Sequence, residues 1–185
     1  MAKKIIIVTG PIGSGKSTTI EYLRKKGFQT LDLDKISNEI INSNESIKFL
    51  DTNFPGVIKN QKLDKDSLAD IVFNDVDKLK TLEEYLHPKI LIEFQQLAAK
   101  IDGVLFVEVS APKNIHKDFE CLVISTPEAV RIERLLDRDM KLNDIKNRIQ
   151  TQQNEDWWNS LGHVIINNSH TSLEQEIDKY INEQI

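Results

Sequence analysis

Runs of apolar residues recur along the chain and predict the strands of a sheet. Four of them are Ile5–Val8, Gly103–Val109, Cys121–Ile124 and Val164–Asn168. Mostly apolar segments of this length are typical of parallel strands that are covered on both faces. A fifth segment, Phe28–Asp34, alternates apolar and polar residues and ends in acid, which predicts one more strand.

The segments between these strands have helical patterns. A helix is expected from the end of the first loop to about Lys26, and Ser172 is expected to cap a final helix. Residues 35–100 have no clear strand. Helices are expected there at 35–41, 46–53, 64–73 and 76–86, followed by a break or restart at Pro88 and a further helical piece.

The last third of the chain predicts one more amphipathic helix and a polar arm. The helix runs from Pro127 to about Asp139, with Ala129, Ile132 and Leu136 on one face and Arg131, Arg134 and Arg138 nearly opposite. Residues 141–160 are polar and are interpreted as a mobile helical arm, in which Trp157 and Trp158 either cover an adenine or, as we favour, anchor the arm to the core. These elements predict one α/β domain, a three-layer α/β/α sandwich with a parallel sheet of about five strands flanked by helices.

A glycine-rich loop connects the first strand to the first helix. Its sequence, Gly10-Pro11-Ile12-Gly13-Ser14-Gly15-Lys16-Ser17, has the spacing of a phosphate-binding P-loop. Glycines allow backbone N–H groups to approach phosphate oxygens, and the helix N-terminus adds a partial positive charge. In this motif the lysine reaches the β- and γ-phosphates and the last serine binds Mg²⁺. Nucleotide binding is therefore assigned to Gly10, Ile12, Gly13, Ser14, Gly15, Lys16, Ser17 and Thr18, with Lys16 also catalytic.

Two carboxylates follow on the second predicted strand. Alternation places Asp32 and Asp34 on the same side, at the edge where open α/β sheets bind ligands. Asp34 is the candidate to orient an acceptor hydroxyl, although it also suits the N-cap of the next helix. Asp32 is a candidate Mg²⁺ ligand with Ser17, or a support for Asp34. Glu108 has two equally good interpretations: it caps the end of its strand, or it supports a Mg²⁺ site without binding the ion directly.

Composition narrows the class of protein. The chain has 185 residues, of which 39% are hydrophobic and 29% charged, and its net charge is −5. These values suit one globular domain and argue against nucleic acid or an anionic membrane as a partner. The single cysteine, Cys121, excludes an internal disulfide and is expected to be buried. The N-terminal apolar stretch is too short to span a bilayer, so we expect a cytoplasmic protein, either a monomer or a weak homo-oligomer.

The loop predicts nucleotide binding but leaves the acceptor open. A regulatory GTPase needs an Asn-Lys-x-Asp segment, which the chain lacks. Small-molecule kinases need an acid near the γ-phosphate, an acceptor pocket and arginines over the transferring group. Asp34, the helical insertion and the face with Arg131, Arg134 and Arg138 supply one candidate for each, although an arginine face also suits a solvated helix.

The chain resembles the dephospho-coenzyme A kinase family, whose members phosphorylate the ribose 3′-hydroxyl of dephospho-CoA. The matching residues run in family order over almost the whole length: Thr9–Thr18, Leu31–Asp34, Leu63–Lys65, Leu68, Ile71–Phe73, Leu86–Ile90, Thr126–Glu128, Arg134, Arg138, Arg148–Ile149, Gln152 and Ile166–Asn168. The resemblance implies ATP and Mg²⁺, a core of residues 1–34, 101–137 and 163–185, a CoA-binding insertion at about 35–100 and a lid at about 138–162.

The resemblance also implies roles for individual residues. Asp34 becomes the acid nearest the acceptor hydroxyl, and Arg134 and Arg138 become contacts to the phosphates, where a guanidinium matches phosphate oxygens. Lys65 and His87 are candidate substrate contacts, although His87 before a proline also suits a structural position. Asn168 either lies beside the nucleotide base or only ends its strand.

Two departures from the family are visible. Glu108–Asn114 stands where the family usually has a Pro-Leu-Leu-Phe-Glu stretch, and Lys65 stands where an arginine is common. Two alternatives remain open: another P-loop kinase acting on a nucleoside, nucleotide or shikimate-like acceptor, and an NTP-hydrolysing switch or assembly factor.

Overall fold

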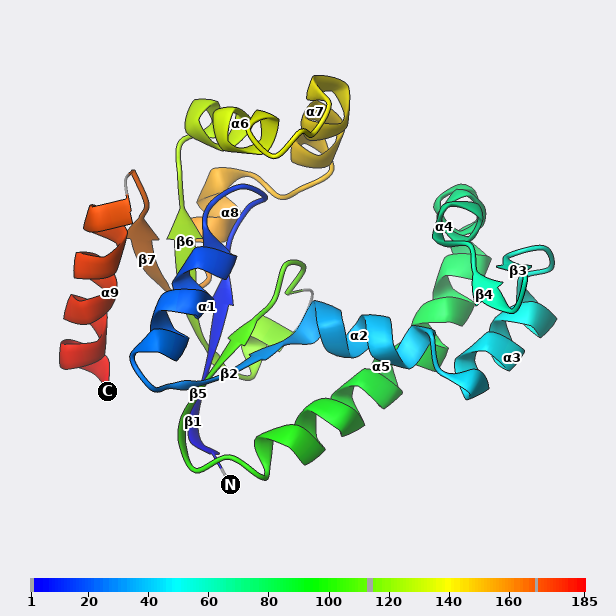
Figure 1. Cartoon of the computed structure of the whole chain (residues 1–185), viewed down its shortest axis with the longest axis horizontal. Helices are drawn as coiled ribbons and strands as arrows, with labels where there is room; N and C mark the ends of the chain where they lie inside the picture. Colours follow the sequence, from blue (N-terminus) through cyan, green and yellow to red (C-terminus); the bar gives the residue numbers. More distant parts are fainter. Residues whose placement is uncertain (1, 113–114, 169) are drawn as a thin grey trace. The chain divides into compact units, whose positions relative to one another are not determined.

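The computed structural model describes residues 2–112, 115–168 and 170–185. Its chain forms two compact units, drawn as ribbons in Figure 1. One comprises Met1–Asp32 and Lys100–Ile185 and is called the sheet unit below; the other comprises Leu33–Ala99 and is called the helical unit. Lys113 and Asn114, which end the stretch that departs from the family, lie outside the described residues.

A parallel sheet forms the centre of the sheet unit. Its strands are β1 (Ala2–Thr9), β2 (Gln29–Asp32), β5 (Gly103–Glu108), β6 (Glu120–Ser125) and β7 (His163–Ile166). They lie in the order β2-β5-β1-β6-β7, and every neighbouring pair is parallel. The predicted fold class is therefore confirmed, and the carboxyl ends of all five strands lie at one edge.

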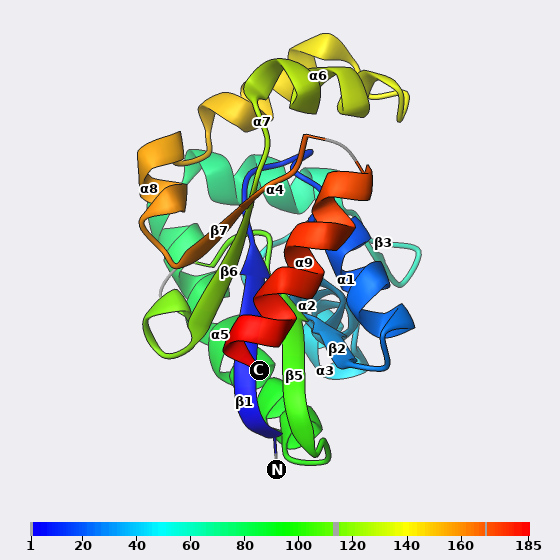
Figure 2. The ribbon, with the colours of Figure 1, turned by 90° about the vertical axis from the view of Figure 1, so that its left-hand side faces the viewer.

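Two helices cover one face of this sheet. They are α1 (Lys16–Lys25) and α9 (His170–Gln184), which lie side by side in Figure 2. Apolar side chains fill the space between helices and strands, including Ile6, Val8, Leu23, Phe106, Leu122 and Ile177. Alternate residues such as Ile7 and Val107 point to the other face and are equally buried. Cys121 is buried, as predicted. The helix α9 begins at His170; the side chain of Ser172, its expected cap, lies outside the described residues.

Short helices form the rest of the sheet unit. They are η1 (Ile115–Lys117), α6 (Glu128–Leu136), α7 (Leu142–Gln150) and α8 (Glu155–Asn159), and α8 packs against β6. Trp158 is 4% exposed, and its indole N–H donates to the Gln153 carbonyl at 3.1 Å. Trp158 therefore anchors this segment to the core, as favoured from the sequence.

The buried face of α6 differs from the prediction. Arg131 and Leu135, four residues apart, are its buried positions, whereas Ala129 and Leu136 are exposed. The amphipathic pattern assumes that a helix packs on an apolar core. This helix instead packs on the polar backbone of the glycine-rich loop, where a guanidinium can donate hydrogen bonds.

The helical unit has its own core. It contains α2 (Leu33–Ile41), α3 (Asn44–Asn53), α4 (Lys65–Asn74) and α5 (Val76–Ala98), with a hairpin of β3 (Ile58–Lys59) and β4 (Lys62–Leu63). One cluster of its buried residues consists of Leu50, Phe54, Val57, Leu68, Val72, Leu82 and Leu86. Phe49 and Tyr85 stack beside them with ring centroids 3.7 Å apart.

Three sequence predictions are wrong in this unit. The second strand ends at Asp32 and α2 begins at Leu33, because Leu33, Ile36 and Ile40 have helical spacing; Asp34 is thus inside the first helical turn and not its N-cap. The helix α5 continues through Pro88 instead of breaking there, with buried residues on both sides of the proline. The hairpin was not expected; Asn60 and Gln61 form its turn with φ of 50° and 62°.

Among the described residues, no helix is both long enough and apolar enough to cross a lipid bilayer.

Candidate active site

The glycine-rich loop leaves the carboxyl end of β1 and leads into α1. Gly10 has a φ of 144°, and a Cβ there would lie 2.2 Å from the Ile124 carbonyl oxygen. Gly15 has a φ of 105°, and its Cβ would lie 2.3 Å from the Asn167 amide nitrogen. Both positions therefore exclude side chains, because L residues disfavour these backbone angles and neighbouring atoms fill the space. The predicted loop-to-helix turn is present, with α1 beginning at Lys16.

Lys16 lies against the loop that precedes it. Its ammonium group donates to the carbonyl oxygens of Gly10 at 2.9 Å and Pro11 at 3.1 Å, and the residue is 8% exposed. The loop thus holds a positive charge at the N-terminus of a helix, where backbone N–H groups already favour anions. This arrangement attracts phosphate groups.

Ser17 connects the loop to the neighbouring strand. Its hydroxyl donates to Oε1 of Glu108 at 2.7 Å, and Glu108 is 8% exposed at the end of β5. In the sheet register, Glu108 is the direct neighbour of Asp32, the last residue of β2. Three oxygen-bearing side chains therefore end at the same edge beside the loop. The described residues contain no group of three His, Cys, Asp or Glu side chains suited to a metal.

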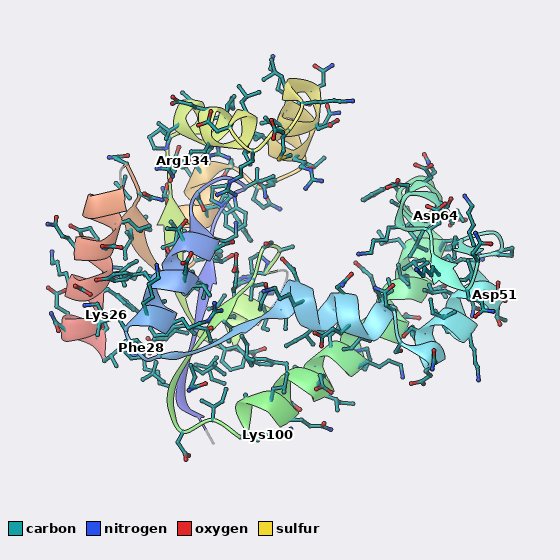
Figure 3. The ribbon with its side chains drawn as sticks, in the orientation of Figure 1. Lys26, Phe28, Asp51, Asp64, Lys100 and Arg134 are labelled. Carbon is teal, nitrogen blue, oxygen red and sulfur yellow. The ribbon has the colours of Figure 1, made fainter. Side chains whose placement is uncertain are left out.

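A second set of contacts braces the loop from the side of β6 and β7. The side-chain amide of Asn167 donates to the Ser14 carbonyl at 2.8 Å. The Thr126 hydroxyl lies 2.9 Å from that same oxygen and 3.0 Å from the Asn167 carbonyl. Arg134 on α6, labelled in Figure 3, donates to the Asn167 carbonyl at 3.3 Å. Asn167 is buried in these contacts, whereas the predicted Asn168 is exposed.

Two adjoining cavities open beside the loop. A cavity of about 240 Å³ is lined by Lys16, Ser17, Glu108, Arg138 and Met140 together with loop residues. A second, of about 180 Å³, is lined by Gly13, Gly15, Thr18, Arg134, Asp137, Arg138 and Asn167. Arg138 and two loop glycines border both cavities. The structure thus brings the predicted loop residues together with Arg134 and Arg138.

Arg131 on α6 also contacts the loop. Its Nε donates to the Thr126 carbonyl at 3.1 Å and its Nη1 to the Ile12 carbonyl at 3.3 Å. Burial lowers the pKa of this guanidinium from its usual value, while the negative charges of Glu128 and Glu155 act in the opposite direction. An arginine stays charged despite such shifts, so a buried cation donates a hydrogen bond to the loop carbonyl of Ile12.

Three predicted residues belong to the helical unit. Asp34 is exposed, two residues after Asp32, so chain length alone keeps their Cα atoms within about 7 Å. The Lys65 ammonium donates to Oδ1 of Asn38, and His87 is exposed on α5. Their predicted contacts with a substrate stay predictions.

The sequence did not single out three residues that contact the loop. Glu108 fits two interpretations equally well, and Gln152 is only one of many residues that carry the family resemblance. For the nucleotide site the sequence favours Asn168 over its neighbour Asn167. Each of the three contacts a residue more than 90 positions away: Ser17 and Glu108 are 91 residues apart, and Ser14 and Asn167 are 153 apart. The signal available for Glu108 was its place at a strand end.

Comparison with known proteins decides the family. The family model for dephospho-CoA kinase matches residues 4–174. The chain belongs to the dephospho-CoA kinase family. A dephospho-CoA kinase from Campylobacter jejuni is 34% identical over 198 residues, covering 98% of this chain and 96% of the relative. One from Helicobacter pylori is 30% identical over 191 residues, covering 97% and 96%.

Solved structures agree with this family. A Campylobacter jejuni dephospho-CoA kinase aligns with a TM-score of 0.70 at 31% identity, covering 97% of this chain and 96% of that one. The Thermus thermophilus protein TT1252 aligns with a TM-score of 0.92 at 26% identity, covering all of both chains. A shikimate kinase from Bacteroides thetaiotaomicron, at 15% identity and a TM-score of 0.55, shares the fold alone. The chain is therefore an enzyme of the kinase class with a nucleotide-binding P-loop.

Proposed function

We propose that this protein transfers the γ-phosphoryl group of ATP to the ribose 3′-hydroxyl of dephospho-CoA, giving CoA and ADP. The observation that carries the proposal is the match of residues 4–174 to the dephospho-CoA kinase family, in a chain whose P-loop has the geometry described above. Phosphoryl transfer requires positioning and charge stabilisation more than covalent help from the protein. The roles below follow from these two requirements.

Nucleotide phosphates are proposed to bind the backbone N–H groups of Gly13–Thr18 at the start of α1. Lys16 then exchanges the carbonyl oxygens of Gly10 and Pro11 for β- and γ-phosphate oxygens, which are stronger partners for an ammonium group because they are charged. Arg134 and Arg138 line the adjoining cavities and add positive charge where the phosphates lie.

The residues beside the loop fit a magnesium ion. Mg²⁺ prefers oxygen ligands, retains several waters and is commonly held by one or two protein groups with substrate phosphates. Ser17 would bind it directly, with Asp32 and Glu108 contacting its waters. The bound ion would neutralise charge on the phosphates. In the protein alone, Glu108 accepts a hydrogen bond from Ser17 and so orients that hydroxyl at the loop.

Asp34 is proposed to orient the acceptor hydroxyl. It is the second residue of the helical unit, two residues after Asp32 at the end of β2, and it is exposed. A carboxylate accepts a hydrogen bond from the hydroxyl and can take its proton as the oxygen–phosphorus bond forms. Lys65 and His87 in the same unit are proposed contacts to dephospho-CoA, and residues 138–162 are proposed to form the lid.

A coupled assay for ADP release tests the proposal. Dephospho-CoA should stimulate ADP release strongly, while shikimate, nucleosides and nucleotides should not. Stimulation by one of the other acceptors would assign the chain to a different kinase activity. Equal ADP release with and without any acceptor would instead indicate an NTP-hydrolysing switch.

A further inference from the structure

The backbone of Ile12, in the glycine-rich loop, forms hydrogen bonds through both its N–H and its carbonyl group. Its N–H donates to Oε1 of Gln152 at 2.9 Å, and its carbonyl accepts from Nη1 of Arg131 at 3.3 Å. Ile12 and Gln152 are 140 residues apart in the chain. In the protein without nucleotide, the Ile12 N–H is therefore taken by a side chain from a distant part of the chain, and Ile12 is a point at which the loop is anchored.

Arg131 is itself fixed in place. It is 9% exposed, and its Nε donates to the Thr126 carbonyl at 3.1 Å, at the end of β6. The same helix lies so close to the loop that a Cβ on Gly13 would be 3.0 Å from the Arg131 carbonyl oxygen. The Ile12 carbonyl is therefore held by a buried partner that forms a second hydrogen bond of its own.

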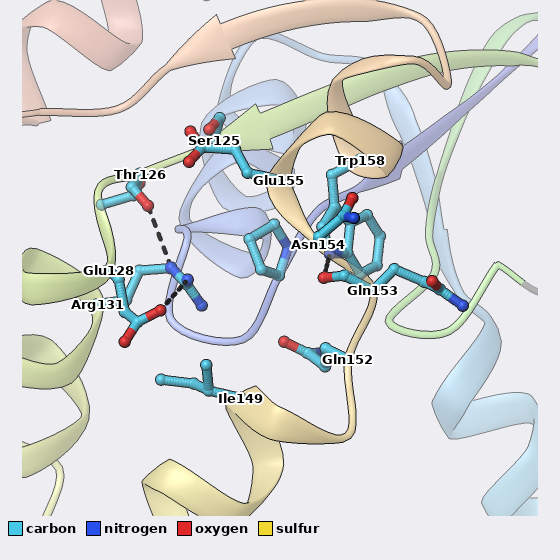
Figure 4. Close-up of a pocket in the computed structure, with 11 residues that line it drawn as sticks. Ser125, Thr126, Glu128, Arg131, Ile149, Gln152, Gln153, Asn154, Glu155 and Trp158 are labelled. Carbon is cyan, nitrogen blue, oxygen red and sulfur yellow. Dashed lines mark hydrogen bonds and ion pairs between the residues drawn. The ribbon is translucent and has the colours of Figure 1, made fainter.

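Gln152 is less buried than Arg131. It follows α7 and lines a cavity of about 340 Å³ with Pro11, Ile149, Gln153 and Trp158 among others, as Figure 4 shows. In that view its side chain lies between the loop and the segment that leads to α8. Arg131 lines the same cavity, so open space adjoins both side chains that bond to Ile12. The hydrogen bond through Gln152 provides a directional link between the loop and residues 150–158.

We propose that Gln152 is a positioning residue that, together with Arg131, presets the P-loop for nucleotide and couples it to the arm of residues 141–160. This inference rests on the proposed nucleotide-binding role of the loop. With the Ile12 backbone fixed at its N–H and its carbonyl, the N–H groups of the following residues are already oriented before phosphate binds. Without Gln152, binding must also order the loop, which weakens affinity because ordering costs conformational entropy.

Gln152→Met provides the test, because methionine has nearly the same length but cannot accept the Ile12 N–H in the same way. The dissociation constant for ADP, measured by calorimetry with Mg²⁺, should rise by about three- to tenfold, the range expected for one hydrogen bond. The KM for ATP should rise in parallel while the KM for dephospho-CoA stays within about twofold. Hydrogen exchange at the Ile12 amide of the nucleotide-free protein should become faster.

Gln153→Met is the matched control, since Gln153 lines the same cavity and the loop takes no hydrogen bond from its side chain among the contacts described above. It should leave ADP affinity and Ile12 exchange unchanged. Gln152→Ala is the second variant and should behave like Gln152→Met. Normal ADP affinity in either folded Gln152 variant, unchanged Ile12 exchange, or equal effects of Gln153→Met would overturn the inference. ADP binding and amide exchange need no acceptor, so they separate this inference from the choice of dephospho-CoA.

Discussion

The two units hold their candidate residues in different ways. In the sheet unit, loop residues bond to partners far away in sequence, such as Ser17 to Glu108 and Ser14 to Asn167. In the helical unit, the candidate residues are exposed, and Lys65 bonds to a partner only 27 residues away. The first arrangement suits phosphates, whose geometry varies little. The second suits side chains that move onto a larger substrate.

The largest effect should come from the loop lysine. Lys16→Ala removes the charge proposed to stabilise the β- and γ-phosphates, so kcat should fall by about 10²- to 10³-fold or more. Lys25→Ala, on the same helix, removes an exposed charge that pairs with Glu21 and should leave kcat unchanged. Steady-state kinetics of both purified variants would measure this. Near-normal turnover by Lys16→Ala would contradict the role of the loop.

The next largest effect should lie where the helical unit begins. Asp34→Asn keeps the shape and removes the charge, so kcat should fall by about 10²-fold or more while ATP affinity changes little. Asp51→Asn on α3, labelled in Figure 3, is a matched control in the same unit. If kcat is unchanged in Asp34→Asn, another residue orients the acceptor.

A substitution at Glu108 tests whether this residue of the sheet unit contributes to Mg²⁺ binding. Glu108→Gln keeps an acceptor near the Ser17 hydroxyl but loses the negative charge. The Mg²⁺ concentration that gives half-maximal activity should therefore rise by about three- to tenfold, because the amide still accepts a hydrogen bond and only the extra strength due to the charge is lost. A magnesium titration at saturating ATP measures it. An unchanged titration would limit Glu108 to a structural role.

The proposed substrate contacts of the helical unit should have effects as large as that of Glu108→Gln, or smaller. Lys65→Ala and His87→Ala should each raise the KM for dephospho-CoA by about three- to tenfold and leave the KM for ATP unchanged, because one polar contact is lost from one substrate. Lys80→Ala removes an exposed lysine that pairs with Glu84 and is the control. A rise in the KM for ATP instead would contradict the proposal that the sheet unit binds ATP and the helical unit binds dephospho-CoA.

The smallest effect concerns stability of the helical unit. Asp64 caps α4 by accepting from the Ser67 N–H at 3.1 Å, and hydrogen bonds from Lys59 and Ser67 lower its pKa to about 2. A lowered carboxyl pKa contributes stability above the unfolded pKa of about 3.8, and this contribution is lost as pH falls toward 2. Asp64→Ala should lower the Tm by a few degrees at pH 7 and by less near pH 2. Equal Tm values for both proteins at pH 7 would show that the cap is unimportant.

Most of the sheet unit could be predicted from local patterns. Buried apolar runs indicate parallel strands, and the loop motif fixes the turn before α1 because few backbones accept that spacing of glycines. The buried face of α6 could not be predicted, since burying Arg131 becomes favourable only when the loop carbonyls are in place. The contacts of Glu108, Gln152 and Asn167 likewise depend on strand order.

Boundaries in the helical unit were harder to predict. Leu33 fits both an alternating strand and a helical face, and the helical packing of Ile36 decides between them. Pro88 removes one backbone hydrogen bond, yet α5 continues because buried residues on both sides hold it. The sequence therefore identifies Asp34 as a candidate residue although it predicts the wrong secondary structure for it.

The most direct test of the central claim is the identity of the product. Phosphorus NMR of a reaction with ATP, Mg²⁺ and dephospho-CoA should show one new phosphomonoester on the ribose 3′-oxygen for each ADP formed. Inorganic phosphate in place of that ester, or an ester on another oxygen, would contradict the account.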